Sequence, residues 1–284
     1  SGSRRDVSVK SSKFHKSDAS VTKPRRKDMM KLYEITFSPT GGTKKVADMI
    51  MDRFRWESSF IDLTDRFTDF STYAFDKEDV CIVAVPSYGG RIPAIVGERL
   101  RQMKGNHAKA VPVTVYGNRA YDDTMLELND TLIEAGFCPV AAIAAVAEHS
   151  IMRQFGAGRP DEEDRRELVD FTDKIKRGIQ NGSLTETPHV PGNRPYRSFD
   201  GVPMKPRSGK NCTKCGLCAE KCPVGAIPTD MPMSTDHSKC ITCMRCIAVC
   251  PQKNRSISKV LVAAGAQKLK KTCRERKKNQ LFLG

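Results

Sequence analysis

Long apolar segments are the first absence from this sequence. The longest apolar stretches, near 139–147 and 260–266, fall short of the ~18 residues that a membrane helix requires. Residues 1–28 contain no apolar core of the kind that a secretory signal peptide needs. We therefore expect a cytoplasmic protein without a membrane span. In that reducing compartment, cysteine thiols stay available as metal or redox ligands.

Two common nucleotide-binding motifs are also missing. Neither G-x4-G-K-[ST] nor G-x-G-x-x-G occurs, so the sequence predicts neither a P-loop nor a dinucleotide-binding domain. Tryptophan is almost absent as well. The single residue, Trp56, is expected at the end of a helix, away from any loop that would stack on a flat ring.

Acidic residues are scarce at both ends of the chain. Residues 1–31 hold ten Lys/Arg and three acidic residues, and residues 253–284 hold ten Lys/Arg and one acidic residue. The formal net charge of +15 therefore belongs to the ends, and the body between them is close to neutral. This distribution argues against a folded nucleic-acid-binding domain, and few aromatic residues interleave the terminal charges. The basic ends are interpreted as solubilising segments or as docking surfaces for an acidic partner.

Strand and helix patterns alternate from residue 31 onward. Strands are expected at 32–37, 60–63, 80–85, 110–116 and 140–146, and helices follow all of them except the second. This alternation predicts an α/β domain over 29–180, with a doubly wound, parallel, five-stranded sheet and helices on both faces.

The rest of the chain divides by composition. Residues 1–28 are predicted to be a disordered basic extension, because they are polar and lack periodicity. Residues 181–204 are rich in proline and are predicted to be a linker, or a strap over the first domain. A cysteine-rich domain follows at 205–255. The remaining basic tail, 256–284, is predicted to be helical from its apolar spacing.

Eight of the eleven cysteines lie between residues 212 and 250. They form two C-x2-C-x2-C-x3-C-P runs that repeat at an interval of 28 residues. In such runs three thiolates wrap one iron–sulfur cluster and the fourth ligates the other. One cluster is therefore expected at Cys212, Cys215, Cys218 and Cys250, and the other at Cys240, Cys243, Cys246 and Cys222. The alternative is a zinc module, which explains the duplicated run poorly.

Three loops are expected at one edge of the sheet. The segment Ser-Pro-Thr-Gly-Gly-Thr at 38–43 follows the first strand and opens a helix, where hydroxyls and glycine amides suit an anion. Two further loops with glycine and tyrosine, at 86–90 and 116–121, follow the third and fourth strands. Doubly wound sheets bind ligands at the carboxyl ends of their strands, so these loops predict a ligand site.

These loops give residues 31–178 a resemblance to the flavodoxin family. Its T-x-T-G-N-T phosphate loop is matched by residues 38–43, its second loop by 86–90, and its G-D-x-x-Y loop by 117–121. Gly42 stands where that family usually has Asn, and Asn118 where it usually has Asp. The resemblance implies FMN, with its phosphate at Thr40, Gly42 and Thr43 and its ring facing Tyr88 or Tyr121. The cofactor-binding residues it implies are Ser38, Thr40, Gly41, Gly42, Thr43, Pro86, Ser87, Tyr88, Gly89, Gly90, Tyr116, Gly117, Asn118, Arg119 and Tyr121. His149, past the fifth strand on the same edge of the sheet, is interpreted as a loop or capping histidine, and the alternative is a role at the flavin.

The cysteine-rich segment resembles the bacterial-type dicluster ferredoxins over about 205–255, which implies two [4Fe–4S] clusters and one-electron transfer. Together the two halves resemble the flavodoxin–ferredoxin fusion proteins of anaerobic bacteria and archaea. That resemblance implies an electron-transfer protein whose FMN and clusters serve an unidentified redox partner protein. Two alternatives stay open. One is a flavin-dependent oxidoreductase acting on a small substrate, although no catalytic residue stands out. The other is a ferredoxin whose flavodoxin-like domain binds no flavin and serves for docking.

Overall fold

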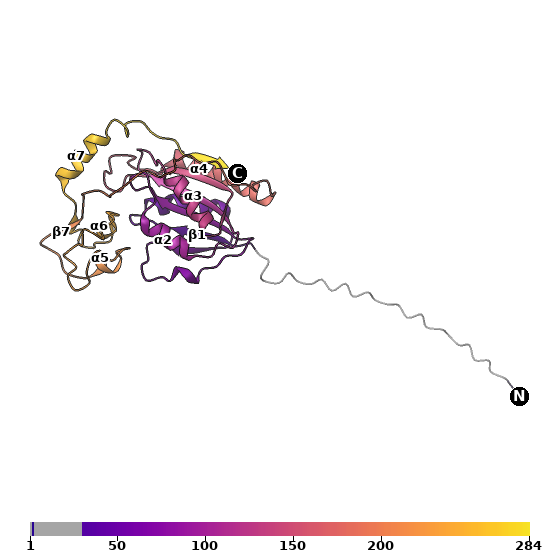
Figure 1. The fold of residues 1–284 in the computed structure, drawn as a ribbon, viewed down its shortest axis with the longest axis horizontal. Helices are drawn as coiled ribbons and strands as arrows, with labels where there is room; N and C mark the ends of the chain where they lie inside the picture. Colours follow the sequence, from indigo (N-terminus) through magenta and orange to yellow (C-terminus); the bar gives the residue numbers. More distant parts are fainter. Residues whose placement is uncertain (1, 3–29) are drawn as a thin grey trace.

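The first half of the chain folds into a twisted sheet between two layers of helices (Figure 1). The computed structural model describes residues 2 and 30–284, so the disorder predicted for 1–28 falls, apart from residue 2, outside the described residues. The principal strands are parallel and lie in the order β2-β1-β3-β4-β6. Their bounds are β1 Leu32–Thr36, β2 Ser58–Asp62, β3 Val80–Pro86, β4 Lys109–Tyr116 and β6 Ala141–Val146. This is the doubly wound, flavodoxin-like strand order, and it confirms the predicted fold class.

Four helices cover the two faces of the sheet. Helices α1 (Gly42–Phe54) and α4 (Glu162–Gln180) pack on one face, and α2 (Ala94–Gln102) and α3 (Thr124–Glu134) pack on the other. Strand β3 shows why its apolar run is unbroken. From Val80 to Val85 its side chains enter the two cores in turn, and all of these six are buried.

The C-terminal tail differs from its predicted helical form. Helix α7 covers only Lys259–Leu269, and the chain then returns to the first domain as β9, Gln280–Leu283 (yellow in Figure 1). Strand β9 pairs antiparallel with β6 and, with the two-residue strand β5 (Cys138–Pro139), brings the sheet to seven strands. The expected five-stranded sheet was therefore incomplete. The physical reason is the edge of β6, whose unpaired backbone groups the tail satisfies.

Asn279 anchors the returning tail. Its Oδ1 accepts the Val146 backbone N–H at 2.9 Å, and its Nδ2 donates to Asp164 Oδ1 at 2.9 Å and to Glu167 Oε2 at 2.7 Å. The Asn279 side chain is buried, and both of its polar atoms have the hydrogen-bond partners that buried polar groups need. The tail is thus fixed to β6 and α4 together.

The cysteine-rich domain keeps its internal repeat in the backbone. The short helices α5 (Leu217–Glu220) and α6 (Arg245–Ala248) are 28 residues apart. Left-handed residues recur at the same interval: Lys214 with Thr242, and Gly216 with Met244. Strands β7 (Arg207–Ser208) and β8 (Arg255–Ser256) pair antiparallel and close the domain. Among the described helices, none has the length and apolarity needed to span a bilayer.

Replacing Asn279 by Ala should destabilise the protein, because it leaves the buried Val146 amide and the Asp164 carboxylate short of partners. The loss of ~1–3 kcal/mol expected for such groups corresponds to a melting temperature lower by roughly 2–10 °C, measured by calorimetry of the intact protein. Lys278→Ala, at an exposed neighbour, is the control and should stay within about 2 °C. Equal melting temperatures for Asn279→Ala and wild type would contradict the anchoring role.

Candidate cofactor sites between the two domains

The loop after β1 presents uncapped amide groups. Gly41 caps α1 with φ 90°, a left-handed conformation that favours glycine, and offers no side chain to the first amides of the helix. Ser38 is held in the loop, where its Oγ accepts the Lys44 backbone N–H at 2.9 Å. The Lys44 amide is thus satisfied, whereas the amides of Gly42 and Thr43, two residues that line a cavity, have no capping side chain.

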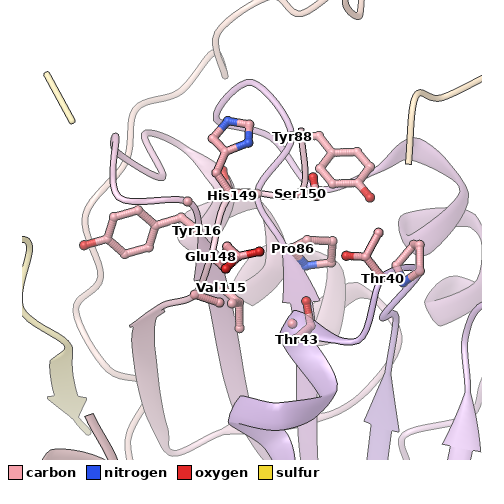
Figure 2. A pocket seen from close by; sticks show the side chains of 14 residues that line it. Thr40, Thr43, Pro86, Tyr88, Val115, Tyr116, Glu148, His149 and Ser150 are labelled. Atoms are coloured by element: carbon pink, nitrogen blue, oxygen red, sulfur yellow. The ribbon is translucent and has the colours of Figure 1, made fainter. Parts of the chain in front are cut away.

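A small cavity lies against this turn, at the carboxyl ends of the strands. Its volume is about 60 Å³, room for on the order of four waters or a group of phosphate size. Figure 2 shows Thr40 and Thr43 on the helix side of the pocket, with Tyr88 and His149 across from them. The predicted site residues that line it are Thr40, Gly42, Thr43, Pro86, Ser87, Tyr88, Tyr116 and Gly117.

A larger cavity of about 360 Å³ adjoins the small one. The two share lining residues, among them Ser87, Tyr88 and His149, and the larger adds the predicted residues Gly89, Gly90 and Arg119. Its size falls within the ~300–1,000 Å³ that ligand pockets span. The two cavities together thus offer a small polar compartment beside a wider one.

Two of the predicted residues hold the C-terminal tail instead of lining these cavities. Asn118 donates from Nδ2 to the Cys273 and Glu275 carbonyl oxygens, both at 2.9 Å, and its Oδ1 accepts the Lys277 N–H at 3.0 Å. Tyr121 donates its hydroxyl to Gln280 Oε1 at 2.5 Å. Of the two tyrosines proposed to face a ring, only Tyr88 lines the two cavities.

His149 caps its own loop and also lines both cavities. Its Nδ1 accepts the backbone N–H groups of Ile151 at 3.2 Å and Met152 at 3.3 Å. Burial, reinforced by the charge of Arg119, lowers the pKa of His149 below its usual value. A neutral ring with Nδ1 as acceptor carries its proton on Nε2. His149 therefore brings a neutral N–H donor to the wall of both cavities.

The proline-rich segment is a strap rather than a free linker. Asp123 holds it from α3's N-terminus, accepting the Asn193 N–H at 2.9 Å and the Arg197 N–H at 2.7 Å. The strap places the Phe199 ring against Gly89, where an added Cβ would come within 2.0 Å of the ring. Phe199 also lines the larger cavity. Sequence analysis missed this residue, and its one signal was an aromatic residue inside a proline-rich stretch.

The cysteine-rich domain docks beside these cavities. Arg245 Nη1 donates to the Pro39 carbonyl at 3.1 Å, and Arg99 Nη2 donates to the Pro223 carbonyl at 2.7 Å. Ile241 and Thr242, between two of the cysteines, line the larger cavity. Burial and the nearby Cys243 raise the pKa of Tyr88 well above its usual value. The cysteine loop 240–246 is therefore the one that faces the first domain's site.

Four cysteines predicted to share a cluster line one cavity. This small apolar cavity, of about 20 Å³, is bordered by Cys212, Cys215, Cys218 and Cys250. Backbone amides point to the sulfurs at equivalent places in the repeat: Ala226 N–H to Cys222 Sγ and Asn254 N–H to Cys250 Sγ, both at 3.3 Å. In the described part of the chain, no three His, Cys, Asp or Glu side chains converge on a single-ion site. The donor set of thiols and amides suits a sulfur-rich cluster.

Comparison with known families identifies this segment. Residues 211–254 match the family model described as a 4Fe–4S dicluster domain. The chain joins a flavodoxin-like domain to a 4Fe–4S dicluster domain. The dicluster match confirms the resemblance of the cysteine runs to ferredoxins, and an iron–sulfur protein suited to electron transfer follows from it.

Each of the similar proteins matches only part of this chain. A component of the ion-translocating oxidoreductase complex of Methanosarcina acetivorans is 41% identical over 59 residues, which are 20% of this chain and 22% of that protein. The chain thus spans about a fifth of that relative's length. A Streptococcus pneumoniae flavodoxin superposes on 52% of this chain and 98% of its own, with 20% identity and a TM-score of 0.36. An archaeal flavodoxin superposes on 53% of this chain and 99% of its own, with 12% identity and a TM-score of 0.38. The strand order identifies the fold of the first domain.

The state of His149 predicts a pH dependence of stability. Its pKa is lower in the folded than in the unfolded protein, so the unfolded chain binds more protons and stability falls as the pH drops below ~6.5. His149→Asn keeps an acceptor for the Ile151 amide but cannot be protonated. We expect its melting temperature to fall less than that of wild type between pH 7.5 and 5.5.

His107→Asn is the matched control for this experiment. His107 is exposed and has φ 65°, a conformation that Asn tolerates. The melting temperature of this variant should fall on acidification by as much as that of wild type. Parallel pH profiles for wild type and His149→Asn would show that the His149 ring does not titrate against folding.

Proposed function

We propose that this protein transfers electrons between FMN, bound in the flavodoxin-like domain, and two [4Fe–4S] clusters in the dicluster domain. The observation that carries the proposal is the shared cavity: Ile241 and Thr242 of a cluster-binding loop border the same space as the Tyr88 and Phe199 rings. When bound, FMN supplies a carrier that takes two electrons and passes them singly to one-electron clusters. The chain's own part is to hold these groups close together and away from water.

The cluster ligands that we propose are the two sets predicted from spacing. Cys212, Cys215, Cys218 and Cys250 would bind one cluster, and their common cavity supports that grouping. The remaining four would bind the cluster next to the first domain. Such thiolate ligands need a reducing compartment, which favours the cytoplasm as the site of action.

The residues at the sheet edge fit FMN. Uncapped amides of α1 and the Thr40 and Thr43 hydroxyls suit its phosphate, and the larger cavity suits its ring, flanked by Tyr88 and Phe199. Arg245 adds a cation beside this loop. Its Nε is buried and has no hydrogen-bond partner among the described residues, so one donor of this cation stays unused next to the phosphate loop. His149 is placed to donate to a ring acceptor.

The electron partner that we propose is an acidic redox protein. Lys268, Lys270, Lys271 and Arg274 are exposed where α7 ends, and Leu269 between them lines the flavin cavity. A basic patch at the rim of a redox site steers an acidic partner to it, with a rate that falls as salt rises.

A second candidate function rests on one further cavity. A space of about 730 Å³ lies between the domains, bordered by Tyr88, Phe199, Lys205 and Lys239. A small anionic substrate there would be beside the flavin site, as a flavin-dependent oxidoreductase requires. The electron-carrier function is favoured because residues of a cluster-binding loop, Ile241 and Thr242, border the proposed flavin cavity itself.

The phosphate site gives the sharpest test of FMN binding. Thr43→Val removes one hydroxyl donor while keeping the side-chain volume. Losing a hydrogen bond to a charged group costs ~1.5–3 kcal/mol, so FMN should bind about 10- to 150-fold more weakly. Riboflavin, which lacks the phosphate, should bind equally to both proteins. Phe199→Ala should instead weaken FMN and riboflavin by the same factor, because it removes a ring contact.

The wild-type composition serves as the reference for these titrations. Anaerobically purified protein should hold about eight iron, eight sulfide and one FMN. Eight iron without FMN binding would favour the flavin-free docking scaffold. Zinc in place of iron would exclude the electron-transfer function.

A further inference from the structure

At one pair of equivalent buried positions, the internal repeat has an apolar residue in one half and a charged residue in the other. Five residues after the fourth cysteine of each run stand Ile227 and Arg255, which are 28 residues apart. Both are 3% exposed. An isoleucine is an ordinary core residue, whereas a buried arginine is rare unless its charge is used or compensated. Among the described residues, the hydrogen bonds of Arg255 go to neutral oxygens and to sulfur rather than to an Asp or Glu carboxylate.

The guanidinium of Arg255 makes its hydrogen bonds within the cysteine-rich domain. Nη1 donates to the Pro232 carbonyl at 2.7 Å and lies 3.7 Å from Cys218 Sγ. Nη2 donates to the Thr235 hydroxyl. Nε is buried and has no hydrogen-bond partner within the described residues. One N–H donor of this buried cation is therefore free to bond an acceptor other than the described residues.

The same guanidinium is close to both predicted cluster sites. Arg255 borders the cavity that Cys218 shares with its three predicted co-ligands. Cys218 and Cys246, which belong to different sets, pack in one small core with Ile227. Helix α6, which carries Cys246, packs against strand β8, which begins at Arg255. Arg255 thus lies between a ligand of one cluster and a ligand of the other.

We propose that Arg255 sets the reduction potentials of both clusters, raising them by its buried positive charge and by N–H groups directed at ligand sulfurs. Reduction adds one electron, and so one negative charge, to a cluster. A fixed cation and hydrogen bonds to sulfur stabilise the reduced form more than the oxidised form, and low surrounding polarity strengthens the effect. The proposal rests on the ligand sets given under Proposed function.

The test is a redox titration of the intact protein with dithionite, followed by the electron paramagnetic resonance of the reduced clusters. Arg255→Met removes the charge and the donors while keeping a long side chain, so both midpoint potentials should shift to more negative values. Arg255→Lys keeps the charge but loses the planar fork, so its shift should be in the same direction and smaller. Arg207→Met removes an equal charge from an exposed site in the same domain and should leave the potentials unchanged within error.

Unchanged potentials in Arg255→Met with full iron content would overturn the proposal. If Arg255→Met assembles fewer clusters, Arg255→Gln decides in the same titration: more negative potentials support the proposal, and wild-type potentials overturn it. Loss of the clusters in both neutral variants, with wild-type potentials in Arg255→Lys, would also overturn it and leave Arg255 a structural residue. Wild-type protein without iron and sulfide would instead reject the proposed function itself, so the two failures are distinguishable.

Discussion

The arrangement of this protein depends on a double attachment of the dicluster domain. The chain enters that domain through a strap fixed to the first domain by Asp123, and leaves it through a tail fixed to β6 and α4 by Asn279. A domain held at both its entry and its exit has little freedom to swing. The contacts of Arg245 and Arg99 with loops of the opposite domain then define which faces meet.

This attachment decides what the site can do. It brings the cysteine loop 240–246 to the carboxyl ends of the parallel strands, where a doubly wound sheet binds its ligand. The half-buried Tyr88 side chain borders the cavity that both of them line. Close spacing favours electron exchange within one chain, so the strap and the tail would serve the proposed electron transfer as much as the loops do.

The elements that sequence analysis predicted are those with a local signal. The strands and helices of the first domain follow from periodicity, as the alternate burial along β3 illustrates. The cysteine runs repeat at a fixed spacing, and the recurrence of left-handed residues such as Lys214 and Thr242 shows that the backbone follows the same repeat.

The parts that were missed are set by contacts far apart in sequence. Strand β9 is four residues long and follows a basic stretch, so only the free edge of β6 makes it a strand. Phe199 gains its place from the anchoring of the strap by Asp123. Asn118 matches a flavin-loop position in sequence, but its side chain is committed to the tail. Arg255 looks like one more basic residue near a basic terminus until its burial is known.

The most direct test of the account is the rate of electron exchange inside one molecule. Protein loaded with FMN and both clusters is mixed rapidly with limiting dithionite, and flavin absorbance and cluster signals are followed at several protein concentrations. Direct contact of the two domains predicts a phase in which electrons redistribute between clusters and flavin at a rate independent of protein concentration. A redistribution whose rate rises in proportion to protein concentration, or none at all, would contradict it.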